Sequence, residues 1–199
     1  MKRIQDKLLI ILILGTMLPM LITETISLQA AKKAQRVQIL NNLDSIVSQK
    51  RNMIDQLFEQ EKSHVQIVSQ MPQAAISIAK LIQGFKQGTQ SSLYKQQLSY
   101  LTPLMATIKA QRELREIYAV SPEGDIVFSL DRKSDFGTNI FSGKFNQSQL
   151  ASAVKQALIR KKPVFSKFNH YAGDKDRFSA FVASPILIKD KVLGVIVFQ

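Results

Sequence analysis

The chain has 199 residues, of which 45% are hydrophobic and 21% are charged, and its formal net charge is +12. This length and composition can bury the core of about one domain and leave residues for an anchor, and they exclude a disordered chain. The sequence contains no cysteine, which excludes disulfides and thiolate metal sites.

The positive charge does not predict a nucleic-acid partner. Lysine and arginine residues are spread along the whole chain among aspartate and glutamate, and no run forms a stripe that could follow a phosphate backbone. The charge fits instead a basic, solvated surface with some affinity for anionic lipid.

The N-terminus predicts a membrane anchor. Residues 1–7 form a basic tail with Lys2, Arg3 and Lys7, and residues 8–22 contain no charged side chain. Extended to residue 28, this transmembrane helix reaches the roughly 20 residues that span a bilayer. A cleaved signal peptide is the alternative, but no good small-x-small cleavage site follows. The short tail favours a cytoplasmic N-terminus and an exported C-terminus, although basic residues flank both ends of the span.

Residues 29–71 predict one long helix, because no proline or glycine occurs between Ser27 and Met71. Apolar residues recur on alternating three- and four-residue steps. They are Leu40, Leu43, Val47, Ile54, Leu57, Val68 and Met71. This stripe either meets a second copy of the chain, which would give a homodimer, or packs against the chain's own domain. Pro72 ends the helix.

Residues 72–112 predict helices that cover a sheet. A short helix begins at Gln73 and ends near Gly84, and a second begins at Ser91 or Ser92 as the N-cap and runs toward Arg112.

Residues 113–199 predict the sheet itself. Strands at 117–121 and 126–130 flank a turn over Pro122 to Asp125, and a helix capped by Asn146 or Ser148 follows a loop that contains glycine. Strands at 164–171, 178–188 and 192–198 complete the order. We therefore expect an α+β fold with a five-stranded antiparallel sheet and helices on one face. Such a sheet leaves a concavity under its crossing loop.

Four short motifs carry a resemblance to a known family. They are Tyr118-x-x-x-Pro122-x-Gly124-x-Ile126-Val127, Asp135-Phe136-Gly137-Thr138-Asn139, Ala180-Phe181-x-Ala183-x-Pro185-Ile186 and Gly194-Val195. With these motifs, residues 115–199 resemble the membrane-distal half of a double Cache domain. That domain is the extracytoplasmic sensor of bacterial methyl-accepting chemotaxis proteins, membrane histidine kinases and nucleotide cyclases.

The resemblance implies a PAS-like sheet that binds a ligand in its concave face and dimerises through the long helix. It also implies a single-pass protein of the inner (plasma) membrane with the sensor module outside the cytoplasm. Such receptors continue into a membrane-proximal module, a second transmembrane helix and an output domain, and this chain stops before them. We therefore expect the N-terminal part of a receptor, either a fragment or a truncated product.

The resemblance also suggests which residues touch a ligand. Cache pockets use aromatic, basic and acidic groups on a small polar molecule such as an amino acid. The available residues of those types here are Asp176 and the six that we take as candidate ligand contacts: Tyr118, Phe128, Arg132, Tyr171, Asp174 and Phe181. For the aromatic residues the alternative is a core side chain. For Arg132 and Asp174 it is a solvated loop charge. Asp135 is expected to bond the backbone amides of Gly137 and Thr138.

The sequence does not predict an enzyme. The two histidines, His64 and His170, have no paired-ligand spacing, and neither a Walker loop nor a nucleophile elbow occurs. We expect no catalytic residue, no metal and no cofactor, and any catalysis would lie in the missing output domain. Two hypotheses remain: a sensory receptor that binds a small ligand, and a membrane-anchored structural or assembly protein with no ligand.

Overall fold

The computed structural model describes residues 2–199. Between residues 2 and 30, it describes the side chains at positions 4, 12–13, 15–17, 19–20, 23–24 and 26–29. The chain divides into two compact units, residues 1–55 and residues 56–199.

The N-terminal helix α1 runs from Lys2 to Gln70 without interruption. It includes the long helix predicted over residues 29–71, except for Met71. Pro19 lies inside it, and the Thr23 hydroxyl donates a hydrogen bond to the Pro19 carbonyl at 2.6 Å. The helix ends where Met71 takes an extended backbone (φ −63°, ψ 116°) in front of Pro72. Proline disfavours the helical conformation in the residue before it, which explains this end.

The predicted transmembrane span over residues 8–28 falls partly on side chains outside the described ones. Among the residues that are described, none of the helices combines the length and the apolar content that a membrane crossing needs. The span therefore stays a prediction.

Helices α2 (Pro72–Lys86) and α3 (Ser92–Gln111) pack against each other. Ser91 caps α3, since its hydroxyl oxygen accepts a hydrogen bond from the Tyr94 N–H at 3.3 Å. The two helices meet closely at Gly84, where an added Cβ would lie 2.7 Å from the Tyr94 nitrogen.

The sheet has five antiparallel strands in the order β2-β1-β7-β6-β3. The strands are β1 (Ile117–Val120), β2 (Ile126–Ser129), β3 (Val164–Phe165), β6 (Val182–Ile188) and β7 (Lys191–Phe198). The predicted hairpin is confirmed: the backbone turns between β1 and β2 at Gly124, whose φ of 98° suits glycine. Helix α4 (Gln149–Arg160) is capped by Ser148, whose hydroxyl accepts from the Ala151 N–H at 3.1 Å.

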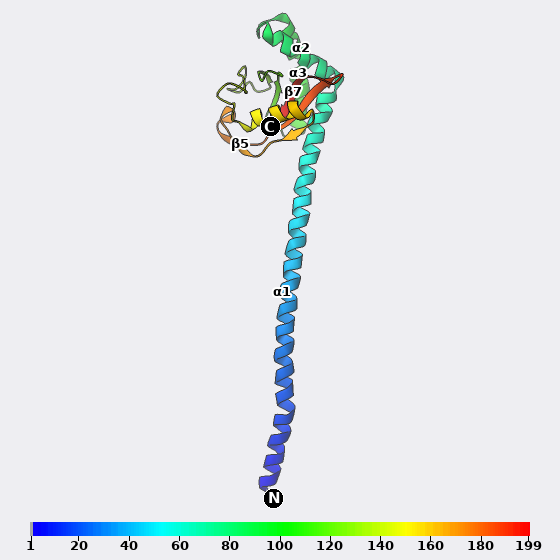
Figure 1. The fold of residues 1–199 in the computed structure, drawn as a ribbon, viewed down its shortest axis with the longest axis vertical. Coiled ribbons are helices and arrows are strands. Elements are labelled where there is room, and N and C mark those ends of the chain that lie inside the picture. Colours follow the sequence, from blue (N-terminus) through cyan, green and yellow to red (C-terminus); the bar gives the residue numbers. More distant parts are fainter. Residues whose placement is uncertain (1) are drawn as a thin grey trace. The chain divides into compact units, whose positions relative to one another are not determined.

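Helices cover both faces of the sheet, so the expectation of helices on one face is wrong. Ile117, Ala119 and Ile196 belong to a core shared with α2, α3 and the last turns of α1. Tyr118 and Val197 point to the opposite face and pack with α4, which is yellow in Figure 1. Successive residues of a strand face opposite sides, and both sides of the central strands are apolar, so both need a cover.

The predicted third and fourth strands are each divided in two. The third predicted strand gives β3 and then β4 (Asn169–Tyr171), and the fourth gives β5 (Arg177–Ser179) and then β6. Strands β3 and β6 belong to the main sheet, whereas β4 pairs with β5 in a separate hairpin. The one-turn helix η1 (Ala172–Asp174) joins β4 to β5. The division falls at Ser166, whose hydroxyl accepts from the Phe181 N–H at 2.8 Å and so ends the regular ladder.

We expect Gly84→Ala to destabilise the fold. Alanine normally favours a helix over glycine by about 1 kcal/mol, but the new methyl group would meet backbone atoms of Tyr94, which cannot move aside without separating α2 from α3. Overpacking of this kind costs about 1–3 kcal/mol, so thermal unfolding should occur several degrees lower. Gly15→Ala is the matched control, because nothing lies within 4 Å of that position. Equal melting temperatures for the two variants would contradict the close approach.

Candidate ligand-binding site

A cavity of about 550 Å³ opens between three segments of residues 56–199: the approach to β1, the loop after β2 and the β4–β5 connection. It is lined by Arg115, Asp131, Lys133, Ser134, Ala172, Gly173, Asp174, Lys175 and Arg177. Four of these side chains are basic and two are acidic, so the cavity favours a ligand with at least one anionic group.

A buried carboxyl lies directly behind this cavity. Asp135 is 0% exposed, and its Oδ2 accepts a short hydrogen bond from the Tyr171 hydroxyl. Among the described residues, its Oδ1 has no hydrogen-bond partner. An unsatisfied buried polar atom costs about 1–3 kcal/mol, so Oδ1 needs a partner that the described residues do not supply, such as a water or a ligand group.

A second buried carboxyl provides the contrast. Glu116 is also 0% exposed, but its Oε1 accepts from the backbone N–H groups of Ile117 and Leu130, both at 2.8 Å. Its Oε2 accepts from the Ser129 hydroxyl at 3.3 Å. Glu116 therefore closes the β1–β2 hairpin as a satisfied structural group, which Asp135 is not.

The electrostatics of the buried site follow from its desolvation. Burial raises the pKa of the Asp135 carboxyl above its ordinary value, although the Tyr171 hydroxyl opposes this change. Burial, and then the negative charge of Asp135, raise the pKa of the Tyr118 and Tyr171 hydroxyls. Both tyrosines are therefore neutral hydrogen-bond donors at neutral pH, and a positive group at Asp135 would be stabilised.

Gly173 is the wall between the cavity and the buried carboxyl. An added Cβ there would lie 2.6 Å from the Tyr171 ring and 2.8 Å from Asp135 Oδ2. The Ser134 hydroxyl holds this wall by donating to the Gly173 carbonyl at 3.3 Å. Only a residue without a side chain fits, so the wall is a single backbone thick.

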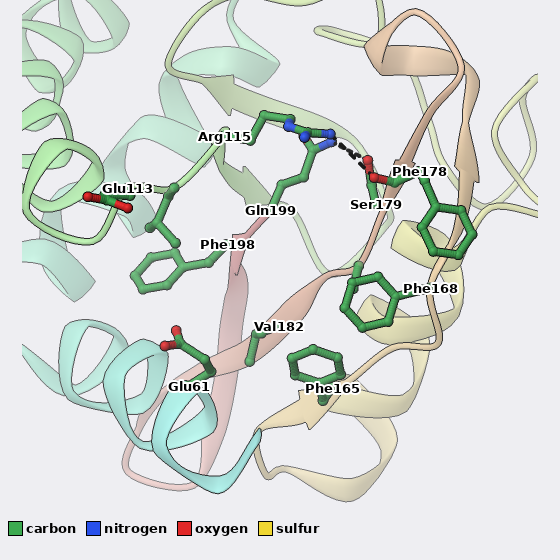
Figure 2. A pocket seen from close by; sticks show the side chains of 12 residues that line it. Glu61, Glu113, Arg115, Phe165, Phe168, Phe178, Ser179, Val182, Phe198 and Gln199 are labelled. Carbon is green, nitrogen blue, oxygen red and sulfur yellow. Dashed lines mark hydrogen bonds between the residues drawn. The ribbon is translucent and has the colours of Figure 1, made fainter. Parts of the chain in front are cut away.

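Gln199 connects the buried site to the cavity. Its Oε1 accepts hydrogen bonds from the Tyr118 hydroxyl and the Lys133 ammonium, both at 3.1 Å. Its Nε2 donates to Asp174 Oδ2 at 3.1 Å and to the Ser179 hydroxyl at 2.9 Å; the bond to Ser179 is visible in Figure 2. One amide therefore fixes four polar side chains from different segments.

Asp174 belongs to the site and is not a solvated loop charge, so that alternative is wrong for it. It is 6% exposed. Its carboxylate lies 3.1 Å from the Lys133 ammonium and 3.8 Å from the Arg115 guanidinium. Because all three groups line the cavity, a ligand would compete with an existing ion pair.

The structure brings together four of the six residues that the sequence predicts. The Tyr171 ring lies 4.9 Å from the Phe181 ring, which lies 6.5 Å from the Tyr118 ring, and Asp174 joins them through Gln199.

The other two predicted residues lie elsewhere. Phe128 lies on the opposite face of the sheet, in the core with α2 and α3. Arg132 is exposed in a left-handed turn (φ 48°), with its guanidinium 5.2 Å from the centre of the Phe136 ring.

The expected local role of Asp135 is wrong. The Thr138 N–H and hydroxyl bond to the backbone carbonyl of Asp135, at 3.1 and 2.6 Å, and the Gly137 N–H donates to the Ile126 carbonyl. The carboxylate is thereby free to face Tyr171. Sequence reasoning also missed Lys133 and Gln199, which carry no local motif and act through distant partners.

We expect Asp135→Asn to stabilise the protein at neutral pH. The pKa of Asp135 is raised in the folded state, so its contribution to stability is present below its unfolded pKa, near 3.9, and is lost as pH rises through the folded value. Asparagine does not ionise, so the variant should gain about 1 kcal/mol at pH 7.5 and nothing at pH 4. Urea unfolding from pH 4 to 8 measures this. Asp176→Asn is the control, with a side chain that is 76% exposed. A gain that does not depend on pH would contradict the assignment.

Comparisons with known proteins identify the fold. The sequence matches no known family description and no curated protein. Among solved structures, the sensor domain of the histidine kinase DctB from V. cholerae is similar with a TM-score of 0.58 and 14% identity, over 82% of this chain and 56% of that one.

Two chemoreceptor ligand-binding domains align more weakly. They are Tlp3 of Campylobacter jejuni with 4-methylisoleucine (TM-score 0.49, 10% identity, 74% of this chain and 52% of that one) and CtaA of Pseudomonas fluorescens with L-serine (TM-score 0.38, 10% identity, 74% and 59%). The chain spans between 52% and 59% of the length of these three domains. The likeness to DctB confirms, for the fold, the predicted resemblance: this chain has the fold of a Cache sensor domain.

Proposed function

We propose that this chain is the N-terminal part of a bacterial transmembrane sensory receptor, of the chemoreceptor or sensor-kinase type, whose extracytoplasmic module binds a small ligand. The observation that carries the proposal is the Asp135 carboxyl, which is fully buried, lacks a partner at Oδ1 among the described residues, and lies one glycine away from a cavity. A fold shared with the sensor domain of a histidine kinase supports it.

The ligand chemistry follows from the charges at the site. A cavity of about 550 Å³ lies within the range of small-molecule sites. Among the residues that line the cavity, Lys133 and Arg115 can bind a carboxylate, and Asp131 and Asp174 can bind an ammonium group. A small molecule with both charges, such as an amino acid or another polar metabolite, therefore fits the site.

The signal would pass through the sheet to α1. Val65 and Val68 of α1 pack in the core on the far face of the sheet, and the Ser69 and Ser184 hydroxyls are hydrogen bonded at 2.9 Å. Ser184 lies in β6, which pairs with β7, and β7 leads directly to Gln199. A ligand that holds Gln199 in one arrangement would bias the position of β7 and β6, and so of the helix end.

The anchor and the oligomer complete the proposal. Residues 8–28 would cross the inner membrane once and leave the module outside the cytoplasm. The apolar stripe of α1 supports a homodimer, because five of its members are between 48% and 60% exposed in the single chain: Leu40, Leu43, Val47, Ile54 and Leu57. Large apolar side chains at such spacing favour pairing with a second helix.

Ligand binding should raise the melting temperature of the full chain in detergent. A screen of amino acids, carboxylates and amines should contain at least one compound that stabilises the native state, by about 2.7 kcal/mol at a hundred times its Kd. Asp174→Asn and Lys133→Met should abolish that shift, since both side chains line the cavity and each variant removes one charge that the ligand would contact.

The exposed Asp176→Asn variant should retain the full shift. If no compound raises the melting temperature, the alternative of a membrane-anchored assembly protein without a ligand replaces the sensor.

The proposed topology makes a separate prediction. Alkaline phosphatase fused after Gln199 should be active in cells, because the fusion point would lie outside the cytoplasm, and a cytoplasmic reporter at the same position should be inactive. The reverse pattern of activity rejects the receptor topology.

A further inference from the structure

We propose a second binding site, for a small organic cation with an apolar body, in a separate cavity of about 310 Å³. Its walls include Phe165, Phe168 and Phe178 on one side and Glu61 of α1 on the other (Figure 2). Val182 and Phe198 also line it, and both belong to the face of the sheet that α1 to α3 cover. The two cavities share Arg115, but the other residues that line them differ.

Two of the three phenylalanines that line the cavity are much more exposed than side chains of a folded core. Phe168 and Phe178 are 52% and 59% exposed, and their rings stack at 5.8 Å with an interplanar angle of 15°. Phe165 continues the row, with its ring 6.0 Å from Phe168 and 4.4 Å from Phe58 of α1. A contiguous exposed aromatic surface of this kind marks a binding site.

The charges at the cavity select a cation. Two carboxylates, Glu61 and Glu113, line it together with one guanidinium, Arg115. The charge of Arg115 is already shared, because its Nη1 donates to the Phe178 carbonyl at 3.3 Å and lies 3.8 Å from Asp174.

The carboxylates of Glu61 and Glu113 have fewer charged partners than the Arg115 guanidinium has. Within the part of the chain that the structure describes, neither glutamate forms a salt bridge to a lysine or arginine, and Glu61 has only the His64 ring nitrogen at 3.7 Å. The faces of phenylalanine rings are electron-rich and attract cations as well. An ammonium group near Glu61, with its apolar body against the phenylalanines, would satisfy both features.

The position of the cavity determines which elements a bound cation would connect. A bound cation would touch α1 through Glu61, β3 through Phe165 and β5 through Phe178. It would therefore hold α1 to these two strands.

Three compounds of the same shape test the charge preference: phenethylammonium, 2-phenylethanol and 3-phenylpropionate. We expect calorimetric titration of the full chain to give binding at least tenfold tighter for the cation than for the neutral or anionic compound. Glu61→Gln and Phe178→Ala should each weaken phenethylammonium binding about tenfold. Both side chains are partly exposed, so the variants should retain the native melting temperature.

Matched controls separate this site from the rest of the molecule. Glu59→Gln removes a carboxylate that is 73% exposed on the same helix, and Ile159→Ala removes an apolar side chain that is 80% exposed elsewhere; both should bind as the unchanged protein does. Asp135→Asn should also leave phenethylammonium binding unchanged. Equal binding of the three compounds, full binding by Glu61→Gln, or loss of binding on Asp135→Asn each overturns the proposal.

Discussion

The pairing of β1 with β7 is the constraint on which the rest of the structure depends. All four residues of β1 are buried, and it pairs with β2 on one side and β7 on the other. The register sets Tyr118 opposite Val197, so Tyr118 faces α4 while Ile117 and Ala119 face the N-terminal helices. A slip of one residue would exchange these faces. It would also remove the Tyr118 hydroxyl from Gln199, so one register decides both the packing and the site.

Most of the buried polar side chains at this end of the strand pair have hydrogen-bond or ion-pair partners. Glu116, Asp174 and Gln199 are buried or half-buried with bonding partners for their side-chain oxygens, which makes a buried polar network stable. Asp135 departs from this pattern, because one of its oxygens is left without a partner. This unpartnered oxygen lies one glycine away from a cavity, which marks this end of the sheet as the candidate site.

Local signals predicted much of the fold. Pro72 ended the long helix, Ser91 and Ser148 capped the helices that follow them, and the Pro122 to Gly124 segment formed the turn. Each of these depends on a few neighbouring residues. The division of the third and fourth strands was missed because an alternating apolar pattern is the same for one strand as for two. The bonds between Ser166 and Phe181 decided it, 15 residues apart in the chain.

For the candidate site, the sequence by itself determined the element types, the resemblance to a sensor fold and the aromatic residues Tyr118, Tyr171 and Phe181. Only the tertiary structure decided that Phe128 faces away from them, that Asp135 turns toward Tyr171, and that Gln199 joins groups as far as 81 residues away. The physical reason is the range of the forces involved. Caps, turns and periodicity act over one or two turns of backbone, whereas the partners of a buried polar group depend on strand register and loop closure across the whole module.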